Sequence, residues 1–214
     1  MPIVMLNDDI YALPNPLLGE DGLVAVGGDL NPKRLIHAYK HGIFPWYGQE
    51  GPILWHAPDP RYVITKDHFH LPKSVREFIA KSQWTVRINT SFDTVIQHCA
   101  SIPRKGQEGT WIHPEMIEAY CQLHAMGYAN SVEVWENDDL IGGLYGIAMG
   151  PIFFGESMFY LKSGASKVAL HHLCTQMDFE LIDVQIPTTL MENFGAYPMQ
   201  LAEFLDILQM HLHK

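Results

Sequence analysis

The stretch Phe153–Leu173, FFGESMFYLKSGASKVALHHL, and the segment Leu181–Gln185, LIDVQ, decide how the chain is interpreted. The first half of the long stretch is apolar apart from Glu156, and the run SGASK then marks a turn. Apolar residues recur at helical spacing after it, so the pattern predicts a strand, a turn and a helix. The free N–H groups at the start of that helix would face whatever Glu156 faces, and they can bind a carbonyl oxygen or an anion.

Three polar side chains in these segments are candidates for one site. Glu156 lies in an apolar run, where a carboxylate without a partner is costly. In LIDVQ, strand alternation predicts that Asp183 and Gln185 share one face while the aliphatic residues point to the other. The alternative is a solvated strand face, with Glu156 paired to Lys162 or Lys167. Spacing alone leaves both interpretations open.

Composition places the chain among soluble globular proteins. It has 214 residues, of which 47% are hydrophobic and 18% charged, enough to bury a core in one domain or in two unequal ones. No segment approaches the roughly 20 continuous apolar residues of a membrane span. The N-terminus has no basic region before an apolar run, so it does not resemble a signal peptide. We therefore expect a cytoplasmic protein.

Cysteine and histidine spacing argues against disulfides and metal sites. The three cysteines are odd in number, widely separated and without CxxC spacing. The closest histidine pairs, His68 with His70 and His171 with His172, lack the i, i+4 helical geometry of a metal-binding pair. We therefore expect no metal and no other cofactor.

Charge is distributed unevenly along the chain. The formal net charge is −10, yet eleven of the fourteen basic residues lie between Lys33 and Lys105, against five acidic ones. That span carries +6 and the remainder −16. A basic span suits contact with phosphates, and Arg104 and Lys105 share a glycine-containing loop with Trp111, whose ring suits stacking. An accidental asymmetry is the alternative.

The rest of the chain divides near Arg61. Before it, Asn31 and Pro32 predict the start of a helix that runs to about Lys40, and two aromatic, proline-rich segments follow. Their rings suit either a plain core or the wall of a pocket. After it, alternation and capping residues predict strands at 62–65, 84–88, 131–136 and 140–148 and helices at 73–81, 91–100 and 114–126.

Several motifs in a fixed order carry a resemblance to a known family. They are VGGDLNPKRLIHAYKHGIFPWY, PILWHAPDPR, GTWI, SVEVW, GGLYGIAMG, FFGESMFY, ASKVAL and LIDVQ, and the match runs from about Pro14 to Phe204. Together they closely resemble the leucyl/phenylalanyl-tRNA–protein transferases of bacteria. The resemblance implies an α+β protein, with a small N-terminal α/β domain over residues 1–61 and a larger GNAT-like acyltransferase domain over residues 62–214.

The same resemblance implies a reaction and its partners. The family transfers Leu or Phe, and less well Met, from aminoacyl-tRNA to proteins with N-terminal Arg or Lys, which marks those proteins for degradation. The implied partners are thus aminoacyl-tRNA and an acceptor protein, without a membrane, and we expect a monomer. Aminolysis of an ester needs only a deprotonated amine, whose unperturbed pKa is about 7.7–8.0. Positioning should therefore supply most of the acceleration.

The family's site residues map onto this sequence through the motifs. By resemblance, Asp183 and Gln185 orient the attacking amine and relay its proton, and Glu156 binds the cationic end of the acceptor. These three are the expected catalytic residues. The expected substrate-binding residues are Trp46 and Trp111 around the aminoacyl-adenosine end of tRNA, Arg104 and Lys105 at phosphates, and Phe154, Met158 and Phe159 around the apolar side chain.

Three positions depart from the family's usual pattern. Leu190 and Asn130 stand where the family usually carries a histidine, and Leu201 stands where it often carries an arginine. These departures affect the expected specificity more than the reaction type.

Two other functions stay open at this point. A GNAT-type acetyltransferase using acetyl-CoA needs a Gln/Arg-x-x-Gly-x-Gly/Ala loop whose N–H groups bind pyrophosphate, a pattern that residues 163–167 lack. A non-catalytic reader of basic N-termini needs the acidic pocket but neither the basic span nor the loop with Trp111. Binding of charged tRNA separates this reader from a transferase.

Overall fold

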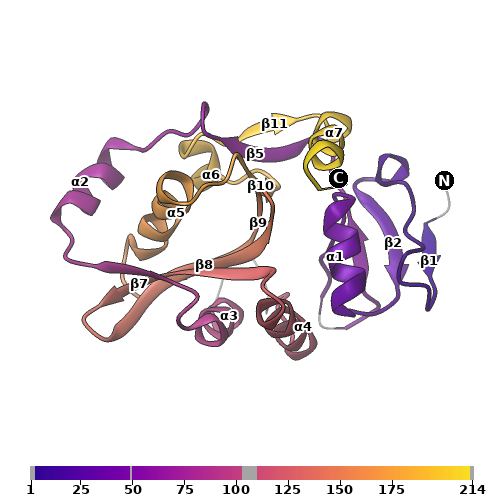
Figure 1. Ribbon diagram of the computed structural model, residues 1–214, viewed down its shortest axis with the longest axis horizontal. Coiled ribbons are helices and arrows are strands. Elements are labelled where there is room, and N and C mark those ends of the chain that lie inside the picture. The colour runs from indigo at the N-terminus through magenta and orange to yellow at the C-terminus, as the bar shows by residue number, and fades with distance from the viewer. Residues whose placement is uncertain (1–2, 49, 103–109, 213–214) are drawn as a thin grey trace.

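The computed structural model describes residues 3–48, 50–102 and 110–212. It contains two β-sheets with helices packed around them (Figure 1), which confirms the mixed α+β class. A four-stranded sheet and helix α1 lie at one end of the molecule, and a seven-stranded sheet forms the larger body. Within the described ranges, no helix is long and apolar enough to cross a membrane.

The small sheet is built from the N-terminal residues and has the strand order β1-β2-β4-β3. Helix α1 (Pro32–Lys40) begins where the sequence predicts, because the Asn31 side chain accepts a hydrogen bond from the Lys33 N–H at 2.9 Å and Pro32 occupies the first turn. The other elements of this part are β1 (Val4–Leu6), the 3₁₀ helix η1 (Pro16–Leu18), β2 (Leu23–Gly27), β3 (Phe44–Pro45) and β4 (Leu54–His56).

The large sheet has the strand order β11-β5-β10-β9-β8-β7-β6. β9 and β10 are parallel, and the other neighbouring pairs are antiparallel. The strands are β5 (Arg61–Thr65), β6 (Thr85–Ile88), β7 (Ala129–Glu136), β8 (Asp139–Met149), β9 (Ile152–Tyr160), β10 (Leu181–Gln185) and β11 (Tyr197–Met199). The strands expected from alternation are confirmed to within about two residues at each end.

Helices cover both faces of the large sheet (Figure 1). Helix α5 (Ala165–Gln176) lies on one face, and α3 (Phe92–Ser101) and α4 (Pro114–Ala125) lie on the other. The remaining helices are α2 (Lys73–Lys81), α6 (Thr189–Asn193) and α7 (Leu201–Leu212). The core on the α3–α4 face continues into the N-terminal part, where Leu35 and Trp55 are fully buried. The N-terminal part is therefore packed against the larger body through a shared core, with α1 on the side that faces that body (Figure 1).

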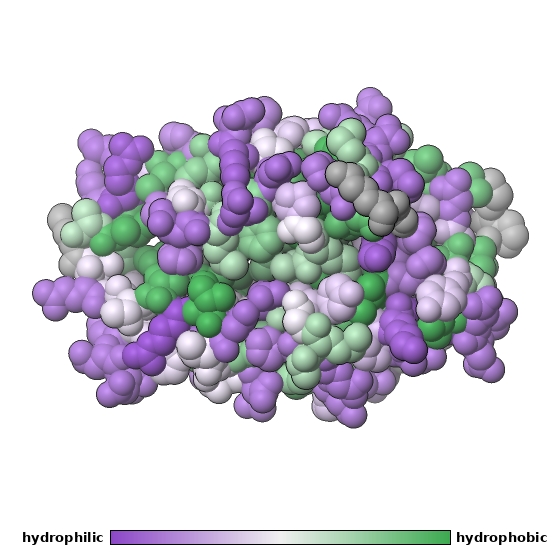
Figure 2. Space-filling model, viewed as in Figure 1, coloured by the Kyte–Doolittle hydropathy of each residue, from purple (hydrophilic) through white to green (hydrophobic). Residues whose placement is uncertain are grey.

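The parallel pair β9 and β10 separates part of the way along its length. Only Leu181–Asp183 and Ile152–Phe154 are in register. β9 continues to Tyr160 beside β8, whereas β10 ends at Gln185, whose φ of +59° takes the backbone out of the extended conformation. Figure 2 shows apolar residues gathered near the middle of the viewed face, with hydrophilic residues around them. The separation of the strands opens a cavity within the sheet.

Candidate active site

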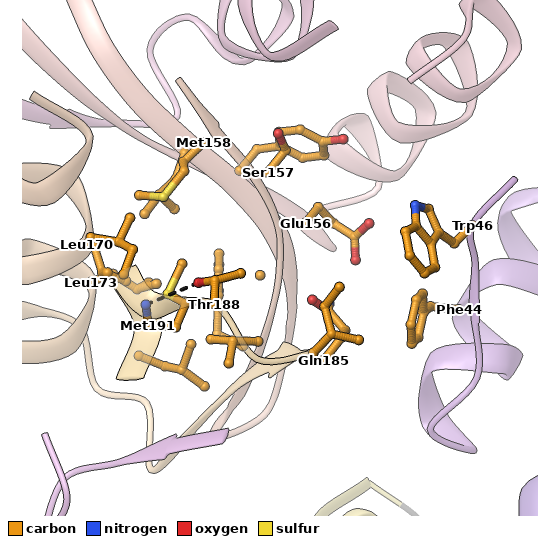
Figure 3. Close-up of a pocket in the computed structure, with 18 of the residues that line it drawn as sticks. Phe44, Trp46, Glu156, Ser157, Met158, Leu170, Leu173, Gln185, Thr188 and Met191 are labelled. Atoms are coloured by element: carbon orange, nitrogen blue, oxygen red, sulfur yellow. Dashed lines mark hydrogen bonds between the residues drawn. The ribbon is translucent and has the colours of Figure 1, made fainter. Parts of the chain in front are cut away.

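A cavity of about 420 Å³ lies where β9 and β10 separate. Figure 3 shows its two ends, an aliphatic one around Met158, Leu170 and Met191 and a polar one at Glu156 and Gln185. Such a pocket can hold an apolar side chain and still present polar atoms to a reacting group. The residues that line it are Phe44, Pro45, Trp46, Trp111, Leu144, Tyr145, Phe153, Gly155, Glu156, Ser157, Met158, Leu170, Leu173, Ile182, Val184, Gln185, Ile186, Thr188, Leu190 and Met191.

Glu156 is held by two buried tyrosines that come from two other elements. The Tyr39 hydroxyl of α1 donates to Oε1 at 2.7 Å, and the Tyr120 hydroxyl of α4 donates to Oε2 at 3.1 Å. The two hydroxyl oxygens lie 2.5 Å apart. Burial first, and then the charge of Glu156, raise the pKa of both tyrosines, so both remain neutral donors. Each carboxylate oxygen thus has its own donor, which fixes the orientation of Glu156.

The protonation of Glu156 is balanced near neutral pH. Burial raises the pKa of this carboxyl to about 7, because the ionised form loses its hydration. The hydrogen bonds from Tyr39 and Tyr120 oppose this shift, the negative charge of Asp183 adds to it, and the positive charge of Arg61 opposes it. A cation brought beside Glu156 would favour the ionised form and gain a charge-assisted partner.

The structural alternative for Glu156, an ion pair with a nearby lysine, is wrong. Lys162 pairs with Glu136 instead, and Lys167 is exposed on α5. The salt bridges of the described residues include none that joins Glu156 to a lysine. The partners of this carboxylate are the two tyrosines.

Asp183 is fully buried and forms a bidentate ion pair with Arg61. The Nε atom of Arg61 donates to Oδ1 at 2.8 Å and Nη2 donates to Oδ2 at 2.6 Å. The Nη1 atom donates to the Gly42 carbonyl at 3.1 Å, and the guanidinium carbon lies 4.8 Å from the ring centroids of both Phe44 and Phe204. This pair therefore joins β10 to β5, to the N-terminal part and to α7.

The structure corrects the expectation that Asp183 and Gln185 share a face. The register shift and the φ of +59° at Gln185 interrupt the strand alternation, so Gln185 lines the cavity while Asp183 points to Arg61. The Gln185 N–H donates to Asp183 Oδ1 at 3.0 Å, which helps to hold a backbone conformation that residues other than glycine rarely adopt. Asp183 thus reaches the cavity through the backbone of Gln185.

Both expected tryptophans lie at the cavity. Trp46 follows β3 and Trp111 precedes α4, and both line the pocket together with Met158. Figure 3 shows Trp46 and Phe44 across the cavity from Glu156 and Gln185. Trp46 is 37% exposed, so its ring remains available to a ligand. The N-terminal part of the chain therefore supplies one wall of the site.

Two expected lining residues do not reach the cavity. Phe154 is fully buried on the opposite face, 5.2 Å from the Tyr39 ring, and Phe159 is 1% exposed and stacks on His98 at 4.7 Å. Successive strand residues point to opposite faces, so Phe153 rather than Phe154 lines the pocket. The choice between these neighbours depends on which helix covers which face, and local sequence does not specify that.

The basic span is only partly available for binding phosphates. Arg34 is 0% exposed and pairs with Asp29 and two backbone carbonyls, and Arg61 is the buried partner of Asp183. Both arginines therefore have structural roles. Arg104 and Lys105, the residues expected at phosphates, lie outside the described residues.

The three positions that depart from the family pattern have different surroundings. Leu190 lines the cavity. Leu201 is 1% exposed and begins α7, where its N–H donates to Asp59 Oδ1 at 3.0 Å. Asn130 accepts a hydrogen bond from the Asn89 side chain at 2.7 Å. Of the three, Leu190 is the one placed to contact a ligand in the pocket.

Sequence reasoning did not identify Tyr39, Tyr120 or Arg61. Their carboxylate partners lie 117, 36 and 122 positions away, and no local spacing connects them. The sequence does indicate that Glu156 needs a hydrogen-bond donor, because an unpaired buried carboxylate is costly. It does not indicate which residue supplies that donor.

Two family models and the named relatives that match this chain indicate one family. A family model described as "Leucyl/phenylalanyl-tRNA protein transferase" matches residues 63–209, and the model of that family's N-terminal domain matches residues 28–59. A protein of Teredinibacter turnerae named leucyl/phenylalanyl-tRNA–protein transferase is 49% identical over 195 residues, which cover 90% of this chain and 75% of that protein. One of the same name from Myxococcus xanthus is 47% identical over 213 residues, covering 97% and 91%.

A solved structure shows a much weaker similarity. A GCN5-related N-acetyltransferase from Kribbella flavida superimposes with a TM-score of 0.39 at 9% sequence identity, covering 77% of this chain and 60% of that protein.

Proposed function

Because the chain belongs to the leucyl/phenylalanyl-tRNA–protein transferase family, we propose that it transfers Leu or Phe, and less well Met, from aminoacyl-tRNA to the α-amine of proteins that begin with Arg or Lys. The observation that carries the proposal is the apolar cavity with Glu156 and Gln185 at its polar end. The residue added at the N-terminus marks the product for degradation. The enzyme acts in the cytoplasm and as a monomer.

The donor's amino-acid side chain occupies the aliphatic end of the cavity. That end is lined mainly by methionine and leucine side chains together with buried aliphatic strand residues, which suit the apolar side chains of Leu, Phe and Met. Trp46 and Trp111 contact the adenosine at the 3′ end of the tRNA, where an indole ring can stack on a base. The exposed cations of the basic span contact tRNA phosphates.

The acceptor's first residue binds at the polar end. The guanidinium or ammonium group of its side chain pairs with the Glu156 carboxylate, which the two tyrosines orient. Its α-amine lies at the side-chain amide of Gln185, whose carbonyl oxygen can accept a hydrogen bond from the amine. Asp183 is a positioning residue in this arrangement, because it acts through the backbone of Gln185.

The reaction is aminolysis of an ester. The deprotonated α-amine attacks the ester carbonyl carbon, a C–N bond forms, and the C–O bond to the tRNA ribose breaks. The proton lost by the amine replaces the acyl group on the ribose oxygen. Holding the two reactants in contact supplies most of the acceleration, because the unperturbed amine is already partly deprotonated at neutral pH.

Transfer of a labelled amino acid tests the proposal. The protein is incubated with radiolabelled Leu-tRNA and an acceptor that begins with Arg, the remaining ester is hydrolysed, and acid-precipitable label is counted. Label in this acceptor, and none in the same acceptor with an acetylated N-terminus, is the expected result. No label above a reaction without the protein would overturn the proposal. A parallel reaction with labelled acetyl-CoA tests the acetyltransferase alternative.

A further inference from the structure

Three kinds of wall enclose the aliphatic end of the cavity, and they differ in how firmly the fold holds them. The strands contribute Phe153, Ile182 and Val184, whose exposed fractions are 0%, 4% and 8%. Helix α5 contributes Leu170 and Leu173, which are 2% and 1% exposed. These side chains belong to the hydrophobic core on this face of the sheet. A change of size at any of them would disturb the core as well as the cavity.

Helix α6 forms the third wall and is held differently. It is five residues long and contains no buried residue. Its start is capped by the Thr188 side chain, which accepts a hydrogen bond from the Met191 N–H at 3.2 Å. Leu190 and Met191 are half-buried and line the cavity, while the neighbouring Thr189 is exposed and lies outside the lining. Figure 3 shows Met191 close to Leu170 and Leu173. Leu190 and Met191 pack against the edge of that core without being buried in it, so a change in their size should disturb the fold less than a change at the buried wall residues.

The C-terminal end of α6 fixes where the helix lies. Phe194 is fully buried, and its carbonyl accepts a hydrogen bond from the His70 N–H at 3.0 Å. Gly195 has a φ of +94°, and a Cβ there would lie 1.9 Å from the His68 carbonyl oxygen, so another residue would require the backbone to move. This anchor holds the helix against the β5–α2 connection. The distance between α6 and the sheet is therefore set by the fold, and the free space depends on the side chains.

We propose that Leu190 and Met191 set the size of donor side chain that the cavity admits. This inference rests on the proposed function, since it assigns the specificity of the same site. A larger side chain at either position reduces the free volume of the cavity. This reduction excludes the bulky ring of Phe more strongly than the smaller side chain of Leu. A smaller side chain removes contacts that hold the smaller donor. The flexible Met191 side chain can adapt to both Leu and Phe, which accounts for one pocket accepting two shapes.

Two substitutions with opposite expected effects test the proposal. Leu190→Phe should favour leucine over phenylalanine, and Met191→Ala should favour phenylalanine over leucine, each by about 10-fold, because a missing or extra methylene in an apolar pocket changes discrimination by about 10–200-fold. Leu-tRNA and Phe-tRNA carrying different radiolabels compete in one reaction, and the ratio of the two labels in the acceptor is measured. That ratio does not depend on the fraction of enzyme that is folded, so a partly destabilised variant is still informative.

Thr189→Phe is the matched control, because it adds the same ring to the same helix outside the cavity lining. It should leave the ratio of labels within about twofold of the original protein. The proposal is overturned if Leu190→Phe and Met191→Ala both leave the ratio unchanged, or if Thr189→Phe shifts it as much as Leu190→Phe does. If the unsubstituted protein transfers neither label, the proposed function fails. If the unsubstituted protein transfers both labels but the ratio is unchanged in Leu190→Phe and Met191→Ala, the proposed function stands and only the role of α6 is rejected.

Discussion

Arg61 and Asp183 bind each other through two hydrogen bonds of 2.8 Å and 2.6 Å, with both side chains fully buried. The same Asp183 oxygen that accepts from Arg61 Nε also accepts from the backbone N–H of Gln185. The ion pair is therefore linked directly to the conformation of a residue that lines the cavity. A substitution in this pair should change both the stability of the fold and the geometry of the site.

Asp183→Asn should lower stability as well as turnover. It leaves the buried guanidinium of Arg61 without its charged partner, a change that costs about 3–5 kcal/mol in comparable pairs. Urea denaturation should show a lower free energy of unfolding. Transfer by the folded fraction should fall about 10²–10⁴-fold if the orientation of Gln185 matters to proton transfer.

A double variant separates these two effects. Combining Asp183→Asn with Arg61→Met removes the buried positive charge, so much of the lost stability should return, but transfer should stay low because Gln185 loses its anionic backbone acceptor. Normal transfer by the double variant would show that Asp183 has only a structural role.

Glu156→Gln should weaken binding of the acceptor protein and leave binding of the aminoacyl-tRNA donor largely unchanged. The amide keeps an oxygen that can accept from tyrosine but loses the charge that attracts Arg or Lys. Charge-assisted hydrogen bonds contribute about 1.5–3 kcal/mol, so the KM of the acceptor should rise by about tenfold or more. Steady-state kinetics with each substrate varied in turn measure the split. A larger effect on the KM of aminoacyl-tRNA would contradict the assignment.

The protonation of Glu156 should make stability depend on pH. Burial raises the pKa of this carboxyl to about 7 in the folded protein, above its ordinary value near 4.5. The stability that protonation of Glu156 contributes is therefore fully present below pH 4.5 and is lost as the pH rises through 7. Glu156→Gln removes that loss. Denaturation experiments at pH 5 and pH 8 measure the free energy of unfolding of both proteins. The value for the variant minus that for the original protein should rise by about 1–3 kcal/mol from pH 5 to pH 8. An equal difference at both pH values would exclude the raised pKa.

Trp111→Ala should weaken binding of aminoacyl-tRNA by about 1–3 kcal/mol, which is the usual contribution of a ring stacked on a base. Trp46→Ala should act in the same direction, because both rings line the cavity. The KM of Phe-tRNA measures the effect, and a thermal melt provides the control. A large drop in melting temperature with an unchanged KM would instead identify the ring as part of the core.

Local sequence patterns predicted the elements that surround the site. The cap at Asn31, the strand that contains Glu156, the turn at Gly164 and the helix that follows all depend on residues a few positions apart, and the structure confirms them. The hairpin of β7 and β8 could also be predicted, because its alternating strands and its turn lie within about 20 consecutive residues.

Contacts between distant residues could not be predicted in the same way. Whether Asp183 faces the cavity depends on a register shift opposite β5 and on the positive φ of Gln185, which both break the alternation that the sequence suggests. The choice of Phe153 over Phe154 as the lining ring depends on which helices cover each face. Tyr39 reaches Glu156 because the N-terminal part packs on α4, and that packing has no local signature.

Tandem mass spectrometry of the acceptor after transfer tests the central claim most directly. The protein is incubated with Leu-tRNA, Phe-tRNA and an acceptor that begins with Arg and also contains internal lysines. The account predicts one added Leu or Phe, joined to the α-amine of the N-terminal Arg. An acceptor with no added residue, or one acylated on lysine side chains with a free N-terminus, would contradict it.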